Sequence, residues 1–465
     1  MKILLITHYY KHKNAMASVR PIKLAKYFAQ EGAEITVLTS MQRDNWCKQE
    51  IVPQPVTNIK EIYAPEYKGM TWLCKLYEFM QRRGKKKLQR IEGNKKEISA
   101  IKKVENNETV CKQVHTGTVA KIKGNIAWLY YYTCDRLENY FLYKGFVNEA
   151  KKQDLRNFDY VIATYPGAGV HNAGIWMKKT GRAKKFVADY RDPAYNPGGR
   201  SRKAEVMHDK KVQDRAVYMA DIIVCVSKGM ANTLSEQYKK EKIAPIFVIH
   251  NGFDPEDHMT TENEILDTHK FNFVYTGALY NGRRTVEMLA EVLKEIVDEG
   301  VIVKNKLAIH YAGSDYSELL NQLEPYGLEE IAVDHGYITR SQALAMQEEA
   351  DVVLLLNWNQ DNYTGVIPGK LYEYMAAKRT IYALIMGNQG NSETAQMIRE
   401  GNLGYACEQA EENDKFFLKQ HMIKMFEKFK NGEHIRIESE SIQQYEYSRL
   451  AKKYLDILLE NKLEM

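Results

Sequence analysis

Lys370 and Glu373 are the two residues of this chain whose types, spacing and position point most directly to chemistry. The apolar run 351–356 predicts a buried parallel strand, and Pro368-Gly369 then breaks the chain ahead of a predicted helix. The unpaired N–H groups and the positive dipole end of that helix attract an anion, and Lys370 adds a full charge. Glu373 can accept hydrogen bonds from two ribose hydroxyls, or it can simply complement the helix dipole or close a capping box.

A second candidate for anion binding is the loop 277–284, which follows the predicted strand 273–276. Gly277 allows the backbone to approach a phosphate closely, and Arg283 and Arg284 supply positive charge. The alternative is a solvated pair of surface arginines.

The first half of the chain carries ionisable residues at the end of the predicted strand 185–189. Asp189, Arg191 and Asp192 are costly in such a place unless they are paired or used, so they predict either a ligand site or a structural ion pair. Arg20 stands at the start of an earlier predicted helix. Its position predicts an exposed side chain, with the steering of an anion as the alternative.

The elements that position these residues follow a repeated strand–helix–strand pattern. Near the N-terminus, a strand at 2–7, a helix at 19–32 and a strand at 33–39 form one βαβ unit, which implies a parallel sheet with a right-handed crossover. A polar run at 256–269 predicts a linker, and the pattern restarts at residue 272. The fold class is therefore α/β, with two Rossmann-like parallel-sheet domains.

Three segments, Asp189–Pro193, Gly277–Arg284 and Pro368–Glu373, occur in an order and spacing that resemble the retaining glycosyltransferases of family 4, which have the two-domain GT-B fold. The resemblance implies two domains facing across a cleft, with a C-terminal helix crossing back to the first. It places the donor diphosphate on Arg283 or Arg284, Lys370 and the helix N-terminus, and the donor ribose on Glu373. It also implies that Tyr337 either stacks on the nucleotide base or belongs to the core.

The full site implied by the resemblance has two parts. The nucleotide-sugar part comprises Gly277, Arg283, Arg284, Tyr337, Gly369, Lys370, Leu371 and Glu373. The acceptor part comprises His171, Arg191 and Asp192, which are the predicted catalytic residues. His171 would approach the donor sugar or the acceptor, with the alternative of capping its own helix. The family normally has a further acid seven residues before Glu373, and this chain has Gly365 there. A subset of the family with a Pro-Gly/Ser-Lys-Leu/Ile-x-Glu-Tyr pattern also lacks that acid.

The predicted domain boundaries follow from the same segments. Residues 1–255 form the acceptor-side domain, with an insertion at about 66–150. Residues 256–440 form the nucleotide-sugar domain, and 441–465 form a helix that packs back on the first domain.

The formal net charge of +6 is concentrated in one segment. Residues 82–123 contain thirteen Lys and Arg and only four Asp and Glu, with aromatic residues on both sides. Such a composition suits an anionic lipid surface, a nucleic acid or a solvated helix without a partner. Because lipid-linked acceptors are common in the resembled family, a membrane surface is the preferred reading, and no nucleic-acid partner is expected.

Other features of the sequence limit the class of protein to which the chain can belong. No run of about 18 apolar residues predicts a spanning helix, and the N-terminus reads as a strand and not as a signal peptide. The six cysteines have no Cys-x-x-Cys pair, which predicts reduced thiols and neither a zinc site nor a disulfide framework. A cytoplasmic protein, peripheral on the inner face of the plasma membrane, is expected.

The sequence has no Asp-x-Asp and no Gly-x4-Gly-Lys-Ser/Thr motif, which disfavours a metal-dependent single-domain glycosyltransferase and a P-loop enzyme. The resemblance therefore implies a metal-independent, retaining hexosyltransferase without a cofactor. It would transfer a sugar from a nucleoside-diphosphate sugar, with UDP favoured, to a glycan or lipid-linked acceptor in cell-surface polysaccharide biosynthesis. The alternative is an inactive GT-B protein that binds nucleotide sugar or membrane as a partner subunit, and Gly365 is its best support.

Overall fold

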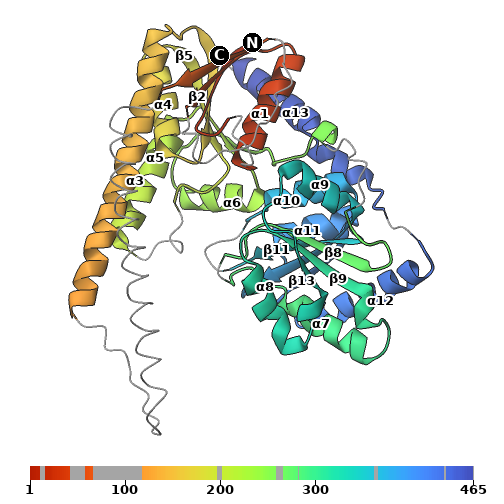
Figure 1. Ribbon diagram of the computed structural model, residues 1–465. Coiled ribbons are helices and arrows are strands. Elements are labelled where there is room, and N and C mark those ends of the chain that lie inside the picture. The colour runs from red at the N-terminus through yellow and green to blue at the C-terminus, as the bar shows by residue number, and fades with distance from the viewer. Residues whose placement is uncertain are drawn as a thin grey trace.

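The computed structural model describes residues 1–10, 16–41, 58–65, 118–195, 202–257, 265–280, 282–360, 365–433 and 436–463. Two parallel sheets, each covered by helices, form two domains that face each other (Figure 1). The predicted fold class, with two Rossmann-like domains, is confirmed.

The N-terminal sheet has seven strands in the order β3-β2-β1-β4-β5-β6-β7, all parallel. The central strands are buried on both faces because helices cover both, as the continuous apolar runs predicted. The strands are β1 Lys2–Thr7, β2 Glu34–Ser40, β3 Ile59–Ala64, β4 Phe158–Tyr165, β5 Ala183–Tyr190, β6 Ile222–Cys225 and β7 Ile246–Val248.

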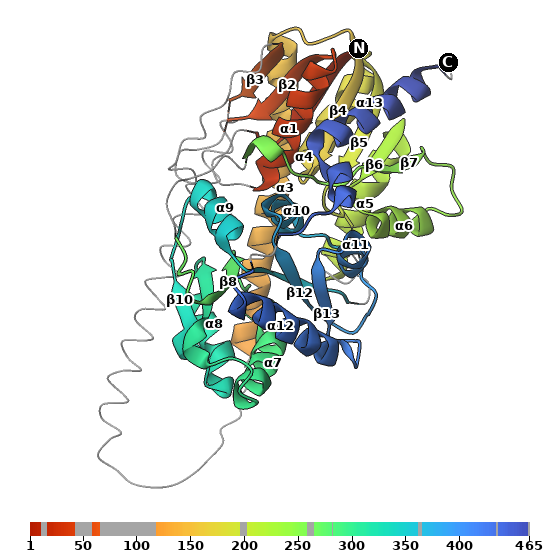
Figure 2. The same ribbon diagram turned by 90° about the vertical axis from the view of Figure 1, so that its right-hand side faces the viewer.

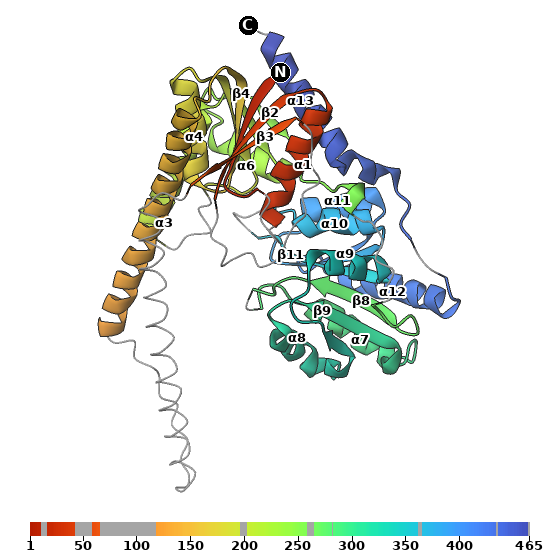
Figure 3. The ribbon, with the colours of Figure 1, turned by 45° about the horizontal axis from the view of Figure 1, so that its top comes forward.

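The helices of this domain are α1 Met16–Gln30, α3 Thr118–Lys152, α4 Ala168–Lys179, α5 Lys203–Met219 and α6 Lys228–Gln237. Helix α3 has 35 residues and extends well beyond the sheet, as Figures 1 and 3 both show. It forms the described part of the expected insertion. Residues 66–117, with most of the basic segment 82–123, lie outside the described residues.

The C-terminal sheet has six parallel strands in the order β10-β9-β8-β11-β12-β13. Its strands are β8 Phe271–Thr276, β9 Leu307–Ala312, β10 Ala332–Asp334, β11 Val352–Trp358, β12 Thr380–Met386 and β13 Gly404–Glu408. Its helices are α7 Glu287–Asp298, α8 Tyr316–Leu323, α9 Arg340–Glu349, α10 Gly369–Ala377, α11 Glu393–Gly401 and α12 Asp414–Lys430. Short 3-10 helices are η3 Pro255–Asp257, η4 Lys304–Lys306, η5 Glu324–Tyr326, η6 Glu329–Ile331 and η7 Glu440–Tyr445.

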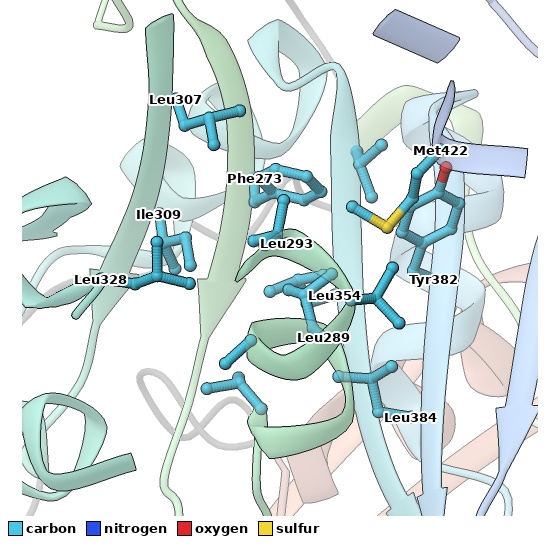
Figure 4. Close-up of a cluster of buried hydrophobic side chains, with 14 of the residues drawn as sticks. Phe273, Leu289, Leu293, Leu307, Ile309, Leu328, Leu354, Tyr382, Leu384 and Met422 are labelled. Atoms are coloured by element: carbon cyan, nitrogen blue, oxygen red, sulfur yellow. The ribbon is translucent and has the colours of Figure 1, made fainter. Parts of the chain in front are cut away.

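Alternate residues of the C-terminal strands enter two separate cores, one on each face of the sheet. Leu354 of β11 belongs to the core under α7 and α12, whereas its neighbour Leu355 belongs to the core under α10 and α11. Figure 4 shows part of the first core, in which Leu289 and Leu293 of α7 pack against the sheet. The second core fixes α10, which carries the predicted Lys370 and Glu373.

The last helix, α13 Tyr447–Leu463, packs on the N-terminal domain, as predicted (Figure 2). Tyr454 meets Phe28 of α1 edge to face, with ring centroids 5.5 Å apart. The hydroxyl of Tyr160 in β4 donates to the carbonyl of Leu458 at 2.6 Å. Helix α13 is therefore part of the core of the N-terminal domain.

A cluster of ion pairs holds the start of the linker against α1. The carboxylate of Asp254 is fully buried and accepts from Lys23 at 2.7 Å, Lys26 at 2.9 Å and the hydroxyl of Tyr27 at 2.9 Å. Burial alone would raise the pKa of Asp254, but the hydrogen bonds and charges of Lys23 and Lys26 outweigh burial and lower the pKa to about 2. The ionised form of Asp254 is therefore stabilised by folding.

This cluster predicts a specific loss of stability in acid. Because the folded pKa of Asp254 is about 2 and an unfolded Asp has a pKa of about 3.9, its contribution of about 2 kcal/mol is present above pH 4 and disappears as the pH falls through 2. Urea unfolding of the wild type and of Asp254→Asn should measure it. The stability difference between the two should shrink by about that amount between pH 5 and pH 2. A difference that does not change with pH would contradict this role.

Candidate functional site

A pocket of about 220 Å³ lies at the carboxyl ends of three strands of the C-terminal sheet. Its walls are the loops after β8, β9 and β10 and the first turns of α9 and α10, which lie on the side that faces the N-terminal domain (Figure 1). The strand order reverses between β8 and β11, next to this pocket. Ligands of open α/β sheets bind at such a switch point. Of the predicted donor residues, the pocket is lined by Gly277, Tyr337, Lys370 and Glu373.

Two glycines let the loops after β8 and β9 approach each other and Lys370. Gly277 has φ +145°, and a Cβ there would lie 3.0 Å from Cε of Lys370. A Cβ on Gly313 would lie 2.4 Å from the carbonyl oxygen of Gly277. Since larger residues would separate these loops, the glycines allow Lys370 to lie close against the backbone. The close approach of a phosphate to Gly277 stays a prediction.

Lys370 is the second residue of α10, and its ammonium group donates to the hydroxyl of Thr276 at 3.0 Å. The N-cap residue, Pro368, makes no side-chain cap, so the start of the helix keeps its free donor capacity. Burial lowers the pKa of Lys370, the nearby charges of Arg284 and Arg340 add to the effect, and Glu373 opposes it. The excess of positive charge favours an anionic ligand.

Glu373 lies one turn further along α10, 7% exposed, at the wall of the same pocket. Its Oε1 is 3.3 Å from the guanidinium of Arg340, the first residue of α9. Arg340 was not among the predicted site residues, although the capping box of Thr339 and Gln342 marks the helix start beside it. Tyr337 is 88% exposed at the pocket wall, so it does not belong to the core.

The two arginines predicted for the donor site have different surroundings. Arg283 is exposed and does not line the pocket. Arg284 is half-buried, with its guanidinium 4.7 Å from the ring centre of Tyr280 and 5.3 Å from that of Trp358. The alternative of a solvated surface pair therefore does not hold for Arg284, which lies near Lys370 but outside the pocket wall. A role of either arginine toward the phosphates stays a prediction.

Two further predicted residues lie at the start of α10. Gly369 begins the helix next to Lys370, and its role toward the diphosphate stays a prediction. The side chain of Leu371 does not line the pocket, because it is fully buried in the core under α10, and its N–H donates to the carbonyl of Pro368 at 3.0 Å. Leu371 fixes the helix and cannot present its side chain to a ligand in the pocket.

On the N-terminal side, the charged end of β5 is built around a buried ion pair. Arg20, 2% exposed, donates to both carboxylate oxygens of Asp189, at 2.9 and 3.4 Å, and to the carbonyl of His250 at 2.7 Å. The prediction of an exposed Arg20 is therefore wrong. Arg191 donates to the backbone carbonyls of Tyr165 and Ala17, which ties β5 to β4 and α1.

Asp192 is exposed at the end of this strand, where a role toward an acceptor stays a prediction. His171 is 2% exposed and packs among the rings of Tyr165, Phe186 and Tyr190. Burial lowers the pKa of His171 to about 4, which keeps the ring neutral near pH 7. This position corrects the prediction that His171 faces an acceptor, and the N-cap of α4 is Gly167, so His171 does not cap the helix either.

Gly365, where the resembled family has an acid, touches the N-terminal domain. A Cβ on Gly365 would lie 2.7 Å from Cα and 2.8 Å from the carbonyl carbon of Gly229 in α6, and the residue has φ +78°. Beside this contact, the carboxylate of Glu393 accepts from the backbone N–H groups of Lys228 and Gly229, both at 2.8 Å. In this arrangement of the domains there is no room for a side chain at position 365.

Because of this contact, Gly365→Ala is expected to lower the free energy of unfolding by more than the left-handed backbone angle of Gly365 explains. Gly432 has a similar φ of +72° and open space around it, so Gly432→Ala should lose only about 1–2 kcal/mol for the left-handed conformation. Gly365→Ala should lose about 1–3 kcal/mol more, because the domains must also move apart locally. Urea unfolding of both variants measures the difference, and equal losses would contradict the tight contact.

No family model and no curated protein matches the sequence. Among solved structures, a sucrose-phosphate synthase from Thermosynechococcus elongatus matches with a TM-score of 0.57, 11% identity and 100% of both chains covered. The S. aureus TarM G117R mutant, in complex with fondaparinux, alpha-GlcNAc-glycerol and UDP, matches with a TM-score of 0.52, 11% identity, and 98% of this chain and 99% of that one covered. The apo lipopolysaccharide outer core galactosyltransferase WaaB matches with a TM-score of 0.51, 11% identity and 99% of both chains covered.

At this level of identity the matches establish the fold, which is the GT-B fold that the resemblance implied. In the described part of the chain, no helix combines the length and apolar character needed to cross a bilayer.

Proposed function

We propose that the chain is a family 4-type glycosyltransferase that moves a hexose from a nucleoside-diphosphate sugar, with UDP favoured, to a glycan or lipid-linked acceptor. The reaction would be retaining and metal-independent, as the family resemblance implies. One observation carries the proposal: Lys370 and Glu373 lie one turn apart at the start of α10 and share a pocket with Gly277 and Tyr337. A cation, a carboxylate, open backbone and an aromatic ring are the groups that a nucleoside diphosphate requires.

The mechanism assigns each group a task. Lys370 and the amide dipoles at the start of α10 would hold the diphosphate and stabilise the charge that develops on it as the glycosidic bond breaks. Glu373 would accept hydrogen bonds from the ribose hydroxyls, and Tyr337 would stack on the base. Because Lys370 already lies against the loop at Gly277 and donates to Thr276, its charge needs little reorganisation during the reaction.

The acceptor and the cellular setting are part of the same proposal. Asp192 and Arg191 are the candidates on the acceptor side, at the carboxyl end of β5. A galactosyltransferase of lipopolysaccharide outer core and a protein bound to UDP and a GlcNAc-glycerol have the same fold, which supports UDP and a role in cell-surface polysaccharide assembly. The basic segment 82–123 would bring the protein to the cytoplasmic face of the membrane. The domain boundaries at 255 and 440 belong to this proposal as well.

The test is turnover of nucleotide sugars by the purified protein. Release of nucleoside diphosphate should be detected from at least one UDP-, GDP- or ADP-sugar, and it should increase when a suitable glycan acceptor is present. Binding of a nucleoside diphosphate without turnover of any of these sugars would instead favour an inactive partner subunit.

Glu373→Gln should lower the affinity for the nucleoside diphosphate by about 10- to 100-fold, because hydrogen bonds to a charged group contribute about 1.5–3 kcal/mol. Inorganic pyrophosphate, which has no ribose, should bind the variant as it binds the wild type. Isothermal titration calorimetry measures both, with Glu427→Gln on the exposed surface of α12 as the matched control. An unchanged affinity for the nucleotide would reject the ribose role.

A further inference from the structure

Arg340 connects the pocket to the linker between the domains. Its guanidinium lies 3.3 Å from Oε1 of Glu373 in the pocket and 3.4–3.5 Å from Oδ2 of Asp257 in η3. The other carboxylate oxygen of Asp257 accepts from Lys23 of α1 at 2.5 Å. A continuous series of charge contacts thus runs from α1 through the linker to the carboxylate of Glu373.

The chemistry of these contacts suits an orienting role. A guanidinium is planar and presents several N–H groups in a fixed fork, so one arginine can hold two carboxylates at a defined angle. Lys370 lacks this geometry, and its ammonium group is already directed to Thr276. Without Arg340, the carboxylate of Glu373 would lose its ion pair with α9 and would be held less firmly in one orientation.

The anchor on the other side of Arg340 is itself fixed. Asp257 lies three residues after Asp254, whose buried carboxylate is held by Lys23 and Lys26. Arg340 is partly exposed at the pocket wall, and its Nε is buried without a hydrogen-bond partner among the described residues. The guanidinium therefore has donor capacity left but is held in place by two acidic side chains from different parts of the chain.

We propose that Arg340 is a positioning residue of the nucleotide site: it orients the carboxylate of Glu373 for the ribose and ties it to Asp257 at the domain junction. This inference rests on the proposed function for the identity of the ligand. It assigns Arg340 an effect on the nucleoside part of the donor, which acts through Glu373, and no direct contact with the diphosphate.

The experiment is a double-mutant cycle measured by calorimetry with UDP, GDP, ADP and inorganic pyrophosphate as the titrants. Arg340→Gln should lower the affinity for the best-binding nucleotide about tenfold and leave the affinity for pyrophosphate within twofold. The double variant Arg340→Gln/Glu373→Gln should bind no more weakly than Glu373→Gln alone, because Arg340 acts through that carboxylate. Arg340→Lys should recover only part of the loss, since a lysine restores charge but not the fork.

Two further variants complete the design. Asp257→Asn should lower nucleotide affinity about threefold, because Arg340 loses one anchor but keeps Glu373. Arg156→Gln, which alters an exposed arginine that pairs with Asp154 on the N-terminal domain, should leave every affinity unchanged.

The outcomes separate the inference from the function on which it rests. Additive losses in the double variant, or a loss for pyrophosphate equal to that for the nucleotide, would show that Arg340 acts independently of Glu373 and would overturn the inference. Unchanged nucleotide affinity in Arg340→Gln would overturn it as well. A wild-type protein that binds none of the three nucleotides would end the proposed function itself.

Discussion

Replacing Lys370 with methionine is expected to lower kcat for sugar transfer by about 10²- to 10³-fold, the effect of removing one preorganised group that stabilises transition-state charge. Lys370 is half-buried, lies against Gly277 and donates a hydrogen bond to the hydroxyl of Thr276. Methionine keeps the length and apolar stem of the side chain, so the loss reports the charge. Steady-state kinetics with the donor identified by the turnover screen measures it.

The matched control is Lys294→Met in α7, which removes an exposed lysine that pairs with Asp298 outside the pocket. This variant should keep the wild-type kcat. If Lys370→Met retained kcat within threefold, Lys370 would not stabilise the leaving diphosphate. If only KM increased, Lys370 would bind donor and transition state equally well.

Replacing Arg20 with methionine is expected to lower the free energy of unfolding by about 3–5 kcal/mol, because the substitution leaves the Asp189 carboxylate buried without its partner. Both side chains are almost fully inaccessible to solvent, and Arg20 also satisfies the carbonyl of His250. Urea unfolding monitored by far-UV circular dichroism measures the loss.

The double variant Arg20→Met/Asp189→Leu is the informative control. Because it removes both charges together, it should recover most of the stability that Arg20→Met loses. If Arg20→Met lowered the free energy of unfolding by less than about 1 kcal/mol, solvent would screen the ion pair. A double variant no more stable than Arg20→Met would show the same. Either result would contradict the burial described for this ion pair.

The regular elements around the donor pocket were predictable because each follows from a local pattern. The apolar run before Pro368 predicted β11, and the break at Pro368-Gly369 with Leu371 and Met375 predicted the start and buried side of α10. The apolar spacing predicted the helix correctly. It did not determine which residues of the first turn face the pocket. Leu371 was assigned to the site although its apolar side chain suited the core.

The partners of charged residues were not predictable, because they come from distant segments. Arg20 pairs with a residue 169 positions away, and Arg340 lies 83 residues from Asp257. Burial of an arginine is rare unless it is paired, so a single sequence favours an exposed side chain, as was expected for Arg20. The two aromatic rings beside the guanidinium of Arg284 also come from different loops, so a single sequence did not pair them with it. Helix α12 and strand β3 were not predicted for a different reason, because neither segment carries a sequence motif that marks it.

Position 365 gives the clearest lesson about the alternative function. The absence of an acid there is the best support from sequence for an inactive protein, but the space that its side chain would need is filled by Gly229 of the other domain. The close contact with Gly229 therefore explains why position 365 is a glycine, independently of activity. It permits the close approach of the domains beside Glu393.

The most direct test of the central claim is a crystal structure of the protein with a UDP-sugar bound. The diphosphate is expected beside the ammonium group of Lys370 and the backbone at Gly277, and the ribose hydroxyls are expected on the carboxylate of Glu373. A nucleotide bound elsewhere, or bound in this pocket with its diphosphate directed away from Lys370, would contradict the account.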